Sequence, residues 1–223
     1  MTDLRSLARN GVLHVAINTG NRALVKAEGD ILDGVSPALG RRLAEQIGAR
    51  FEPVIYDGAG KVFEDAGADR WDVAFLAIDP MRAERVSFTR PYHLIEATYA
   101  VRADSGLNDP EDADQEGVRV LTSVGSAYDM YLRANLSNAK LDREGTPTES
   151  FQRFRGGAGD AVAGVRASLD RFFSGDETVR VLPGVLTKVE QAMVLNGPAH
   201  PSVASLDTFV SEAISSGFVA DQL

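Results

Sequence analysis

The sequence contains no cysteine, and this absence excludes several kinds of chemistry at once. Disulfide bonds, thiolate metal sites and a cysteine nucleophile all require that residue. The three histidines, His14, His93 and His200, are far apart and lack the paired spacing typical of metal ligands. We therefore expect no metal site and no cofactor.

Positive charge is also scarce, because 23 Lys and Arg face 32 Asp and Glu and leave a net charge of −9. Nucleic-acid binding needs a concentrated basic face, so a nucleic-acid partner is not expected. A small anionic ligand remains compatible, because a single buried arginine can hold it. No apolar run approaches the ~20 residues needed to cross a bilayer, so no membrane-spanning segment is expected.

Apolar runs and helix-period segments alternate twice along the chain. This order predicts an α/β protein with two blocks, each a mostly parallel sheet with crossover helices on both faces. The expected strands are 12–17, 51–56 and 73–76 in the first block and 118–121, 161–165 and 179–182 in the second. Helices are expected from Ser36, as N-cap, to Gly48, over 60–66, from Ser126, and over 206–214. A polar, acidic segment over 103–117 is expected to be a solvated connection.

Extended segments over 93–101 and 188–195 join the two blocks. If the last helix packs on the first block, the chain crosses twice between two lobes. Paired linkers of this kind form a hinge over a cleft, and ligands prefer such clefts and the carboxyl ends of parallel strands.

The stretch "FLAIDPMRAERVSFTRPY", residues 75–92, is the most informative segment for function. A strand-like run ends at Asp79-Pro80 and is followed at once by Arg82. One interpretation is an ordinary surface turn in which Arg82 pairs with Asp79 or Glu84. The other is a strand end that brings an anion-binding arginine into a cleft.

Several segments together resemble the family 3 extracellular solute-binding proteins, the polar-amino-acid receptors of ABC importers. They include "GVLHVAINTGN", "WDVAFLAIDPMRAERVSFTRPYHLIEATYAV", "GVRVLTSVGSAYDMYL" and "GDAVAGVR". The resemblance implies a two-lobed type II periplasmic-binding-protein fold. Lobe one would comprise residues 1–98 and 192–223, and lobe two residues 99–191. It also implies a monomer with no enzymatic activity that binds a small carboxylate or amino acid between the lobes, with an ABC permease as partner.

The resemblance also assigns residues to the site. Arg82 would hold the ligand carboxylate, which suits the bidentate geometry of a guanidinium. Gly125 and Ser126, at the start of a helix in lobe two, would supply N–H donors. Asn18 falls at the position after the first strand, and Asp79 lies next to the arginine.

The sequence departs from the family pattern at the pocket itself. Ala77 stands where a Thr or Ser is usual, and Val165, followed by Arg166, stands where an acid usually holds the ligand ammonium. With Arg82 and Arg166 but no acid, the site suits a carboxylate that lacks a free ammonium, or a dicarboxylate. Asp79 or Glu96 could still supply the negative charge.

Two other functions remain open at this point. A sensory or cytoplasmic ligand-binding protein of the same fold is one, because the N-terminus shows no secretory signal. By resemblance the protein is periplasmic, and it is cytoplasmic if Met1 is the native start. A lyase similar to the cyclohexadienyl dehydratases is the other, with Glu96 or Asp79 as the general acid.

Overall fold

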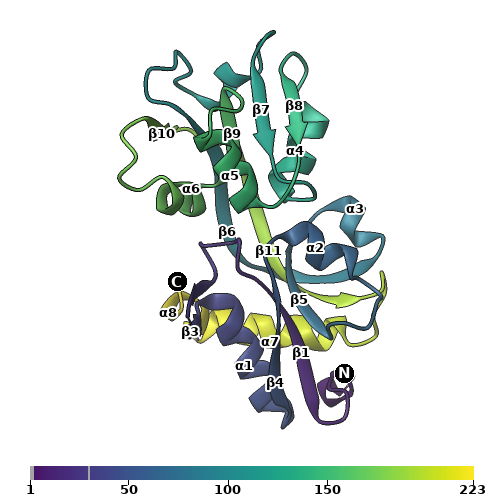
Figure 1. Ribbon diagram of the computed structural model, residues 1–223. Helices are drawn as coiled ribbons and strands as arrows, with labels where there is room; N and C mark the ends of the chain where they lie inside the picture. Colours follow the sequence, from purple (N-terminus) through teal and green to yellow (C-terminus); the bar gives the residue numbers. More distant parts are fainter. Residues whose placement is uncertain (1–2, 30) are drawn as a thin grey trace. The chain divides into compact units, whose positions relative to one another are not determined.

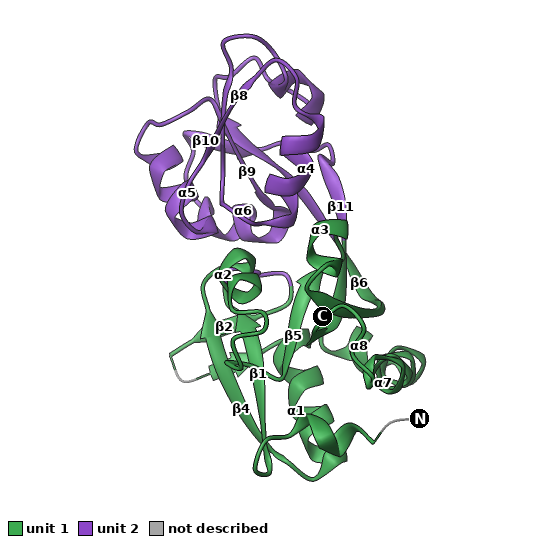
Figure 2. Cartoon of the chain, turned by 90° about the vertical axis from the view of Figure 1, so that its right-hand side faces the viewer, with its two compact units in different colours: residues 1–19, 24–94, 190–223 green, residues 20–23, 95–189 purple. Residues whose placement is uncertain are grey.

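The computed structural model describes residues 3–29 and 31–223. The chain divides into two compact units (Figure 2). Unit 1 comprises residues 1–19, 24–94 and 190–223, and unit 2 comprises residues 20–23 and 95–189. The crossings at 94/95 and 189/190 lie near the linkers expected at 98/99 and 191/192. The short segment Gly20–Ala23, which follows the first strand, belongs to unit 2 and was not anticipated.

Figure 1 traces the elements of both units. In unit 1 they are the 3-10 turn Leu4–Leu7, β1 (Val12–Asn18), β2 (Lys26–Glu28), β3 (Ile31–Asp33), α1 (Val35–Ile47), β4 (Arg50–Tyr56), α2 (Ala59–Glu64), β5 (Val73–Ala77), α3 (Pro80–Ala83), α7 (Val203–Ser215) and α8 (Phe218–Asp221). In unit 2 they are the 3-10 turn Pro110–Ala113, β7 (Arg119–Thr122), α4 (Ala127–Asn135), β8 (Lys140–Arg143), α5 (Pro147–Arg155), β9 (Ala161–Val165), α6 (Arg166–Phe172) and β10 (Val179–Val181). Strands β6 (Val86–Arg102) and β11 (Thr187–Asn196) each pass from one unit to the other.

Each unit contains a mostly parallel arrangement of strands. In unit 1, β1 pairs in parallel with both β4 and β5, and β11 runs antiparallel to β5. In unit 2, β7 pairs in parallel with both β8 and β9, and β6 runs antiparallel to β9. The carboxyl ends of β1 and β5 therefore meet at one edge in unit 1, and those of β7 and β9 meet at one edge in unit 2.

Separate apolar clusters cover the two faces of the unit 2 strands. Tyr128 and Leu132 of α4 pack with Tyr99 and Ala163 on one face. On the other face, a cluster from α5, α6 and the strands contains Phe151, Phe154, Leu169, Phe173, Leu121 and Val162. Alternate residues of each strand thus point to opposite cores, as expected for strands buried on both sides.

The start of α1 differs from the sequence-based expectation. Its N-cap is Gly34 rather than Ser36, and the helix begins at Val35. Gly34 has a φ of 98°, and a Cβ at this position would lie 2.6 Å from the carbonyl oxygen of Leu24. Ser36 lies inside the helix, and its hydroxyl shares a hydrogen bond of 3.3 Å with the hydroxyl of Tyr92.

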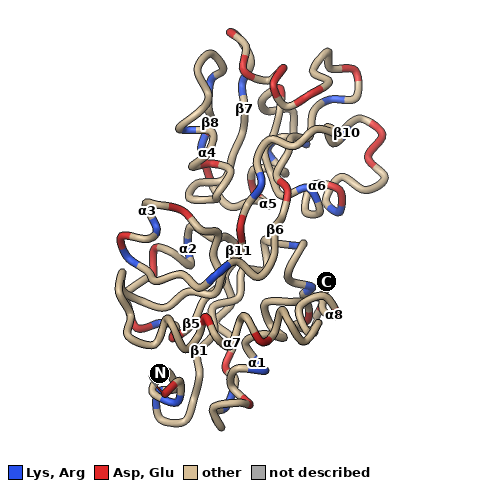
Figure 3. Tube along the Cα trace, turned by 180° about the vertical axis from the view of Figure 1, so that it is seen from behind, with Lys and Arg blue, Asp and Glu red and all other residues tan. Residues whose placement is uncertain are grey.

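Several short elements were missed by the sequence pattern. The hairpin β2–β3, the strand β8 and the helix α5 were not expected, and the 103–117 connection contains a 3-10 turn in which Pro110 and Ala113 are buried. Strand β8 reads "KLDR", which has no apolar alternation, because it lies at the edge of the sheet. Figure 3 shows acidic and basic residues interspersed along both units.

Candidate functional site

Four of the predicted site residues gather at the carboxyl edge of the unit 1 strands. Asn18 is the last residue of β1, and Ala77 is the last residue of the neighbouring parallel strand β5. Asp79 and Arg82 follow Ala77 directly, in the turn and the short helix α3. The parallel pairing of β1 and β5 therefore brings residues more than fifty positions apart in sequence to one edge.

The turn between β5 and α3 is held by its own side chains. Asp79 caps the helix, because its Oδ1 atom accepts hydrogen bonds from the backbone N–H groups of Met81 at 2.8 Å and Arg82 at 3.3 Å. Pro80 occupies the first helical turn, where its fixed φ is compatible with the helix. The Arg82 side chain turns back toward the strand, and its Nη1 donates to the carbonyl oxygen of Ala77 at 3.0 Å.

Arg82 is a buried cation, not a surface arginine, because only 1% of its surface is exposed. Burial lowers the pKa of its guanidinium to about 10, and the nearby carboxylate of Asp79 opposes part of that shift. The group still carries its charge at neutral pH. Since desolvation outweighs the attraction of Asp79, an additional anion next to Arg82 would be favoured.

In unit 2, Gly125 and Ser126 follow β7, while Val165 and Arg166 stand at the end of β9. The Gly125 N–H donates to Oδ2 of Asp129 at 3.0 Å, so this expected ligand donor already has an acceptor within the unit. Ser126 is the N-cap of α4, as the sequence predicted, and its hydroxyl oxygen accepts from the N–H of Asp129 at 3.0 Å.

Asp129 is a buried carboxylate whose importance the sequence-based reasoning missed. Its side chain is fully buried and accepts two hydrogen bonds from Arg143, from Nε at 2.7 Å and from Nη2 at 2.8 Å. With its bond to Gly125, Asp129 ties the turn before α4 to the end of β8. The spacing Ser126-x-x-Asp129, typical of a capped helix start, is the signal that could have identified it.

Arg166 is bound on nearly all sides by groups of unit 2. Its Nε lies 3.3 Å from the carboxylate of Glu96, and its Nη1 donates to the carbonyl of Leu182 at 2.9 Å. Its Nη2 donates to the carbonyls of Pro183 at 3.1 Å and Gly184 at 2.8 Å. A cation at a helix start is unfavourable by itself, and these acceptors explain why Arg166 is tolerated there.

The two acids considered as proton donors are thus both engaged in intramolecular bonds, Asp79 with its own helix and Glu96 with Arg166. Across residues 3–29 and 31–223, no three His, Asp or Glu side chains are grouped so as to hold a metal ion. Over the same ranges, every helix is too short or too polar to cross a bilayer.

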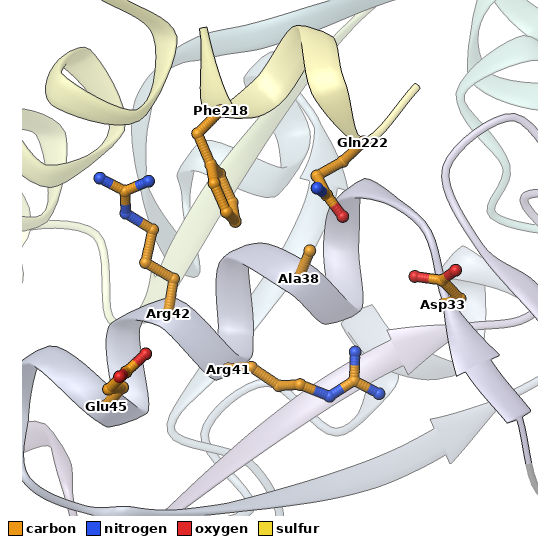
Figure 4. Close-up of a pocket in the computed structure, with 7 residues that line it drawn as sticks. All are labelled: Asp33, Ala38, Arg41, Arg42, Glu45, Phe218 and Gln222. Atoms are coloured by element: carbon orange, nitrogen blue, oxygen red, sulfur yellow. The ribbon is translucent and has the colours of Figure 1, made fainter. Parts of the chain in front are cut away.

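A pocket of about 420 Å³ lies within unit 1, between α1 and α8 (Figure 4). It is lined by Asp33, Ala38, Arg41, Arg42, Glu45, Phe218 and Gln222. The guanidinium of Arg42 lies 4.4 Å from the centre of the Phe218 ring. None of the predicted site residues lines this pocket, so it is separate from the strand edge that carries Arg82.

Comparison with known proteins identifies the family. The sequence model of the bacterial extracellular solute-binding proteins, family 3, matches residues 13–215. Among curated protein sequences, the chain finds no significant match.

Solved structures of the same fold are similar over almost the whole chain. A mutant of ArgBP from T. maritima has 18% identity and a TM-score of 0.84, covering 99% of this chain and 97% of its own. The cysteine-binding protein from Campylobacter jejuni has 20% identity and a TM-score of 0.84, covering 100% and 91%. The ancestral amino acid-binding protein AncCDT-1, a precursor of cyclohexadienyl dehydratase, has 18% identity and a TM-score of 0.82, covering 99% and 97%.

These findings confirm the predicted α/β fold of the periplasmic-binding-protein type. Because the family match extends over most of the sequence, from the first strand to the end of α7, the chain belongs to the bacterial extracellular solute-binding proteins of family 3.

Proposed function

We propose that this protein reversibly binds a small carboxylate, amino-acid-like or another organic acid, as the solute receptor of an ABC-type importer. The observation that carries the proposal is the buried Arg82 at the carboxyl edge of the unit 1 strands. A desolvated guanidinium gains from a carboxylate partner, and it can form two parallel hydrogen bonds with one.

The family and its solved relatives support this proposal. The cysteine-binding protein is named for an amino acid, and ArgBP has been captured in an arginine-bound form. Both ligands carry a carboxylate. The family consists of solute-binding proteins, which supports binding rather than catalysis.

The decisive experiment is a ligand screen on the parent protein and on Arg82→Met. Amino acids, monocarboxylates and dicarboxylates would be screened by thermal shift, and the hits measured by isothermal titration calorimetry. Loss of a charge-assisted carboxylate pair should raise the Kd of a hit by about 100-fold, equivalent to about 3 kcal/mol.

Arg70→Met is the matched control, because it removes a cation of unit 1 whose side chain is 67% exposed. The control should bind like the parent. Equal binding by the parent and Arg82→Met would contradict the proposed role of Arg82. Recovery of the hit unchanged after incubation would support a receptor, whereas its conversion at catalytic protein concentrations would contradict one.

A further inference from the structure

Asp79 is an acidic residue at the start of α3, the short helix that carries Arg82. A fixed negative charge therefore stands beside the arginine that is proposed to bind a carboxylate. All of the groups involved belong to unit 1. The inference rests on the proposed function, since it takes Arg82 as the residue that holds the ligand carboxylate.

The local geometry brings the Asp79 carboxylate and the Arg82 guanidinium to one turn of the chain. Oδ1 of Asp79 accepts from the backbone N–H groups of Met81 at 2.8 Å and Arg82 at 3.3 Å, which holds the carboxylate at the start of the helix. The Arg82 side chain folds back toward the same turn, because its Nη1 donates to the carbonyl of Ala77 at 3.0 Å. Only one residue separates Ala77 from Asp79, and a chain spans at most about 7 Å over two residues.

Only one of the two Asp79 oxygens is used by the helix cap. Across the residues that the structure describes, Oδ2 has no hydrogen-bond partner, and Asp79 is only partly buried. Arg82 is buried, and desolvation strengthens the interaction between nearby charges. Burial lowers the pKa of Arg82 and the Asp79 carboxylate opposes that shift, so the charge of Asp79 acts on the guanidinium.

A negative charge in this position affects two classes of ligand in opposite directions. A ligand whose only charge is the carboxylate on Arg82 brings a second anion close to Asp79, and like charges repel. A ligand with an ammonium on the carbon next to its carboxylate also brings a cation, which Asp79 attracts. Capping itself does not require the charge, because Asn and Ser cap helices about as well as Asp. The charge of Asp79 therefore distinguishes the two ligand classes.

We propose that Asp79 is a specificity-determining residue, which selects ligands that carry a cationic group next to the carboxylate over carboxylates without one. Arg82 binds the carboxylate of the ligand, and the Asp79 carboxylate stabilises the adjacent ammonium. The same charge weakens the binding of a carboxylate that has no ammonium beside it.

The test compares pairs of ligands that differ only in the ammonium. The pairs are leucine with 4-methylpentanoate, arginine with 5-guanidinopentanoate, and cysteine with 3-mercaptopropanoate. Titration calorimetry of the parent protein should show, in at least one pair, the amino acid binding about tenfold or more tightly than its partner. Equal or tighter binding of the partner in every pair that binds would contradict the proposal.

Asp79→Asn removes the charge and keeps an equally good helix cap. It should reduce the preference for the amino acid by about tenfold, because the amino acid loses an attractive charge and its partner loses a repulsive one. The two Kd values should therefore change in opposite directions, and Asp79→Ser should give the same shift. Damage to the helix alone would weaken both ligands alike, so equal fold-changes for the two ligands would overturn the role of Asp79.

Glu84→Gln is the matched control, because it removes an exposed carboxylate two residues after Arg82, at the other end of α3. The control should keep the ratio of Kd values of the parent. A shift as large as that in Asp79→Asn would show that the ratio follows the net charge of the protein, and it would remove the case for Asp79.

The outcomes separate this inference from the proposed function. Binding that is lost in Arg82→Met, with a ratio of Kd values that Asp79→Asn leaves unchanged, would reject the role of Asp79 and leave carboxylate binding intact. No binding by any of the six compounds, or binding that Arg82→Met does not weaken, would count against the proposed function itself.

Discussion

Arg82 in unit 1 and Arg166 in unit 2 occupy corresponding positions in their own units. Each follows the carboxyl end of a buried parallel strand and lies in the short helix that comes next. The sequence offered both as anion-binding residues. Arg82 is buried and donates to the carbonyl of the strand residue Ala77, whereas Arg166 is bound by Glu96 and by three successive carbonyl groups.

The difference shows that the local acceptors of an arginine decide its role. A guanidinium that donates to several carbonyl groups of one loop stabilises that loop. Thr98 shares this task, because its hydroxyl donates to the carbonyl of Gly184 at 2.7 Å. A guanidinium that is desolvated next to one acid gains instead from an external anion. We therefore expect replacement of Arg166 to lower the free energy of unfolding much more than replacement of Arg82.

The largest effect on folding should come from Arg166→Met. The carbonyls of Leu182, Pro183 and Gly184 would lose their charged donor, and Glu96 would lose its partner, so the free energy of unfolding should fall by about 3 kcal/mol. Urea unfolding measures the loss, and hydrogen exchange should increase over 182–186.

Arg171→Met, an exposed position at the end of the same helix, is the control for this prediction. It should leave both measurements close to those of the parent. A loss below about 0.5 kcal/mol in Arg166→Met would contradict its structural role.

A smaller change in the free energy of unfolding is expected for Arg82→Met measured without ligand. Removing a buried cation relieves its desolvation, while the carbonyl of Ala77 loses one donor. These contributions oppose each other, so the free energy of unfolding should change by no more than about 1 kcal/mol in either direction. A loss above about 2 kcal/mol would make Arg82 a structural residue like Arg166.

The smallest effect on the free energy of unfolding should come from Arg90→Met. Arg90 is an exposed residue of unit 1 and binds Asp207 through Nη2 at 2.7 Å. Hydrogen bonds from Arg90 lower the pKa of the Asp207 carboxyl below its usual 3.8, against the effect of burial. A lowered folded-state pKa stabilises the protein above the usual value, and the gain is lost as pH falls through the folded-state value. The difference between the parent and Arg90→Met should therefore shrink below pH 3.8.

Urea midpoints at neutral pH and at about pH 3 measure this dependence. Asp207→Asn provides the second arm of a double-mutant cycle. A coupling between the two residues that is as large at low pH as at neutral pH would contradict the ion-pair explanation.

Local sequence patterns predicted much of the fold because they reflect local physics. The five residues of β5 are all buried, so the run at 73–77 is uniformly apolar. Gly48 ends α1 with a φ of 70°, a conformation that glycine adopts readily. The Asp79-Pro80 pair starts α3 as a capped helix. Short elements without such patterns, such as β8 and the hairpin β2–β3, were missed.

The candidate site was predicted only in part, because sequence patterns report local structure and not the contacts between separate elements. The sequence placed Arg82 and Asn18 at strand ends, and strand pairing brings those ends to one edge. It could not indicate that Asp129 binds both Gly125 and Arg143, because those contacts join residues from separate elements. A hydrogen-bond partner of this kind depends on packing, not on local periodicity.

The sequence by itself indicated the family, the α/β class with its main buried strands, and the residue types available for the site. Tertiary structure decided which of those residues are buried and which groups of the chain bind them. The carbonyls of Leu182 to Gly184 come from a loop sixteen or more residues after Arg166, and only the folded chain brings them to its guanidinium. Burial of Arg82 likewise arises from the surrounding chain, because desolvation depends on every neighbouring atom and is not encoded in a single motif.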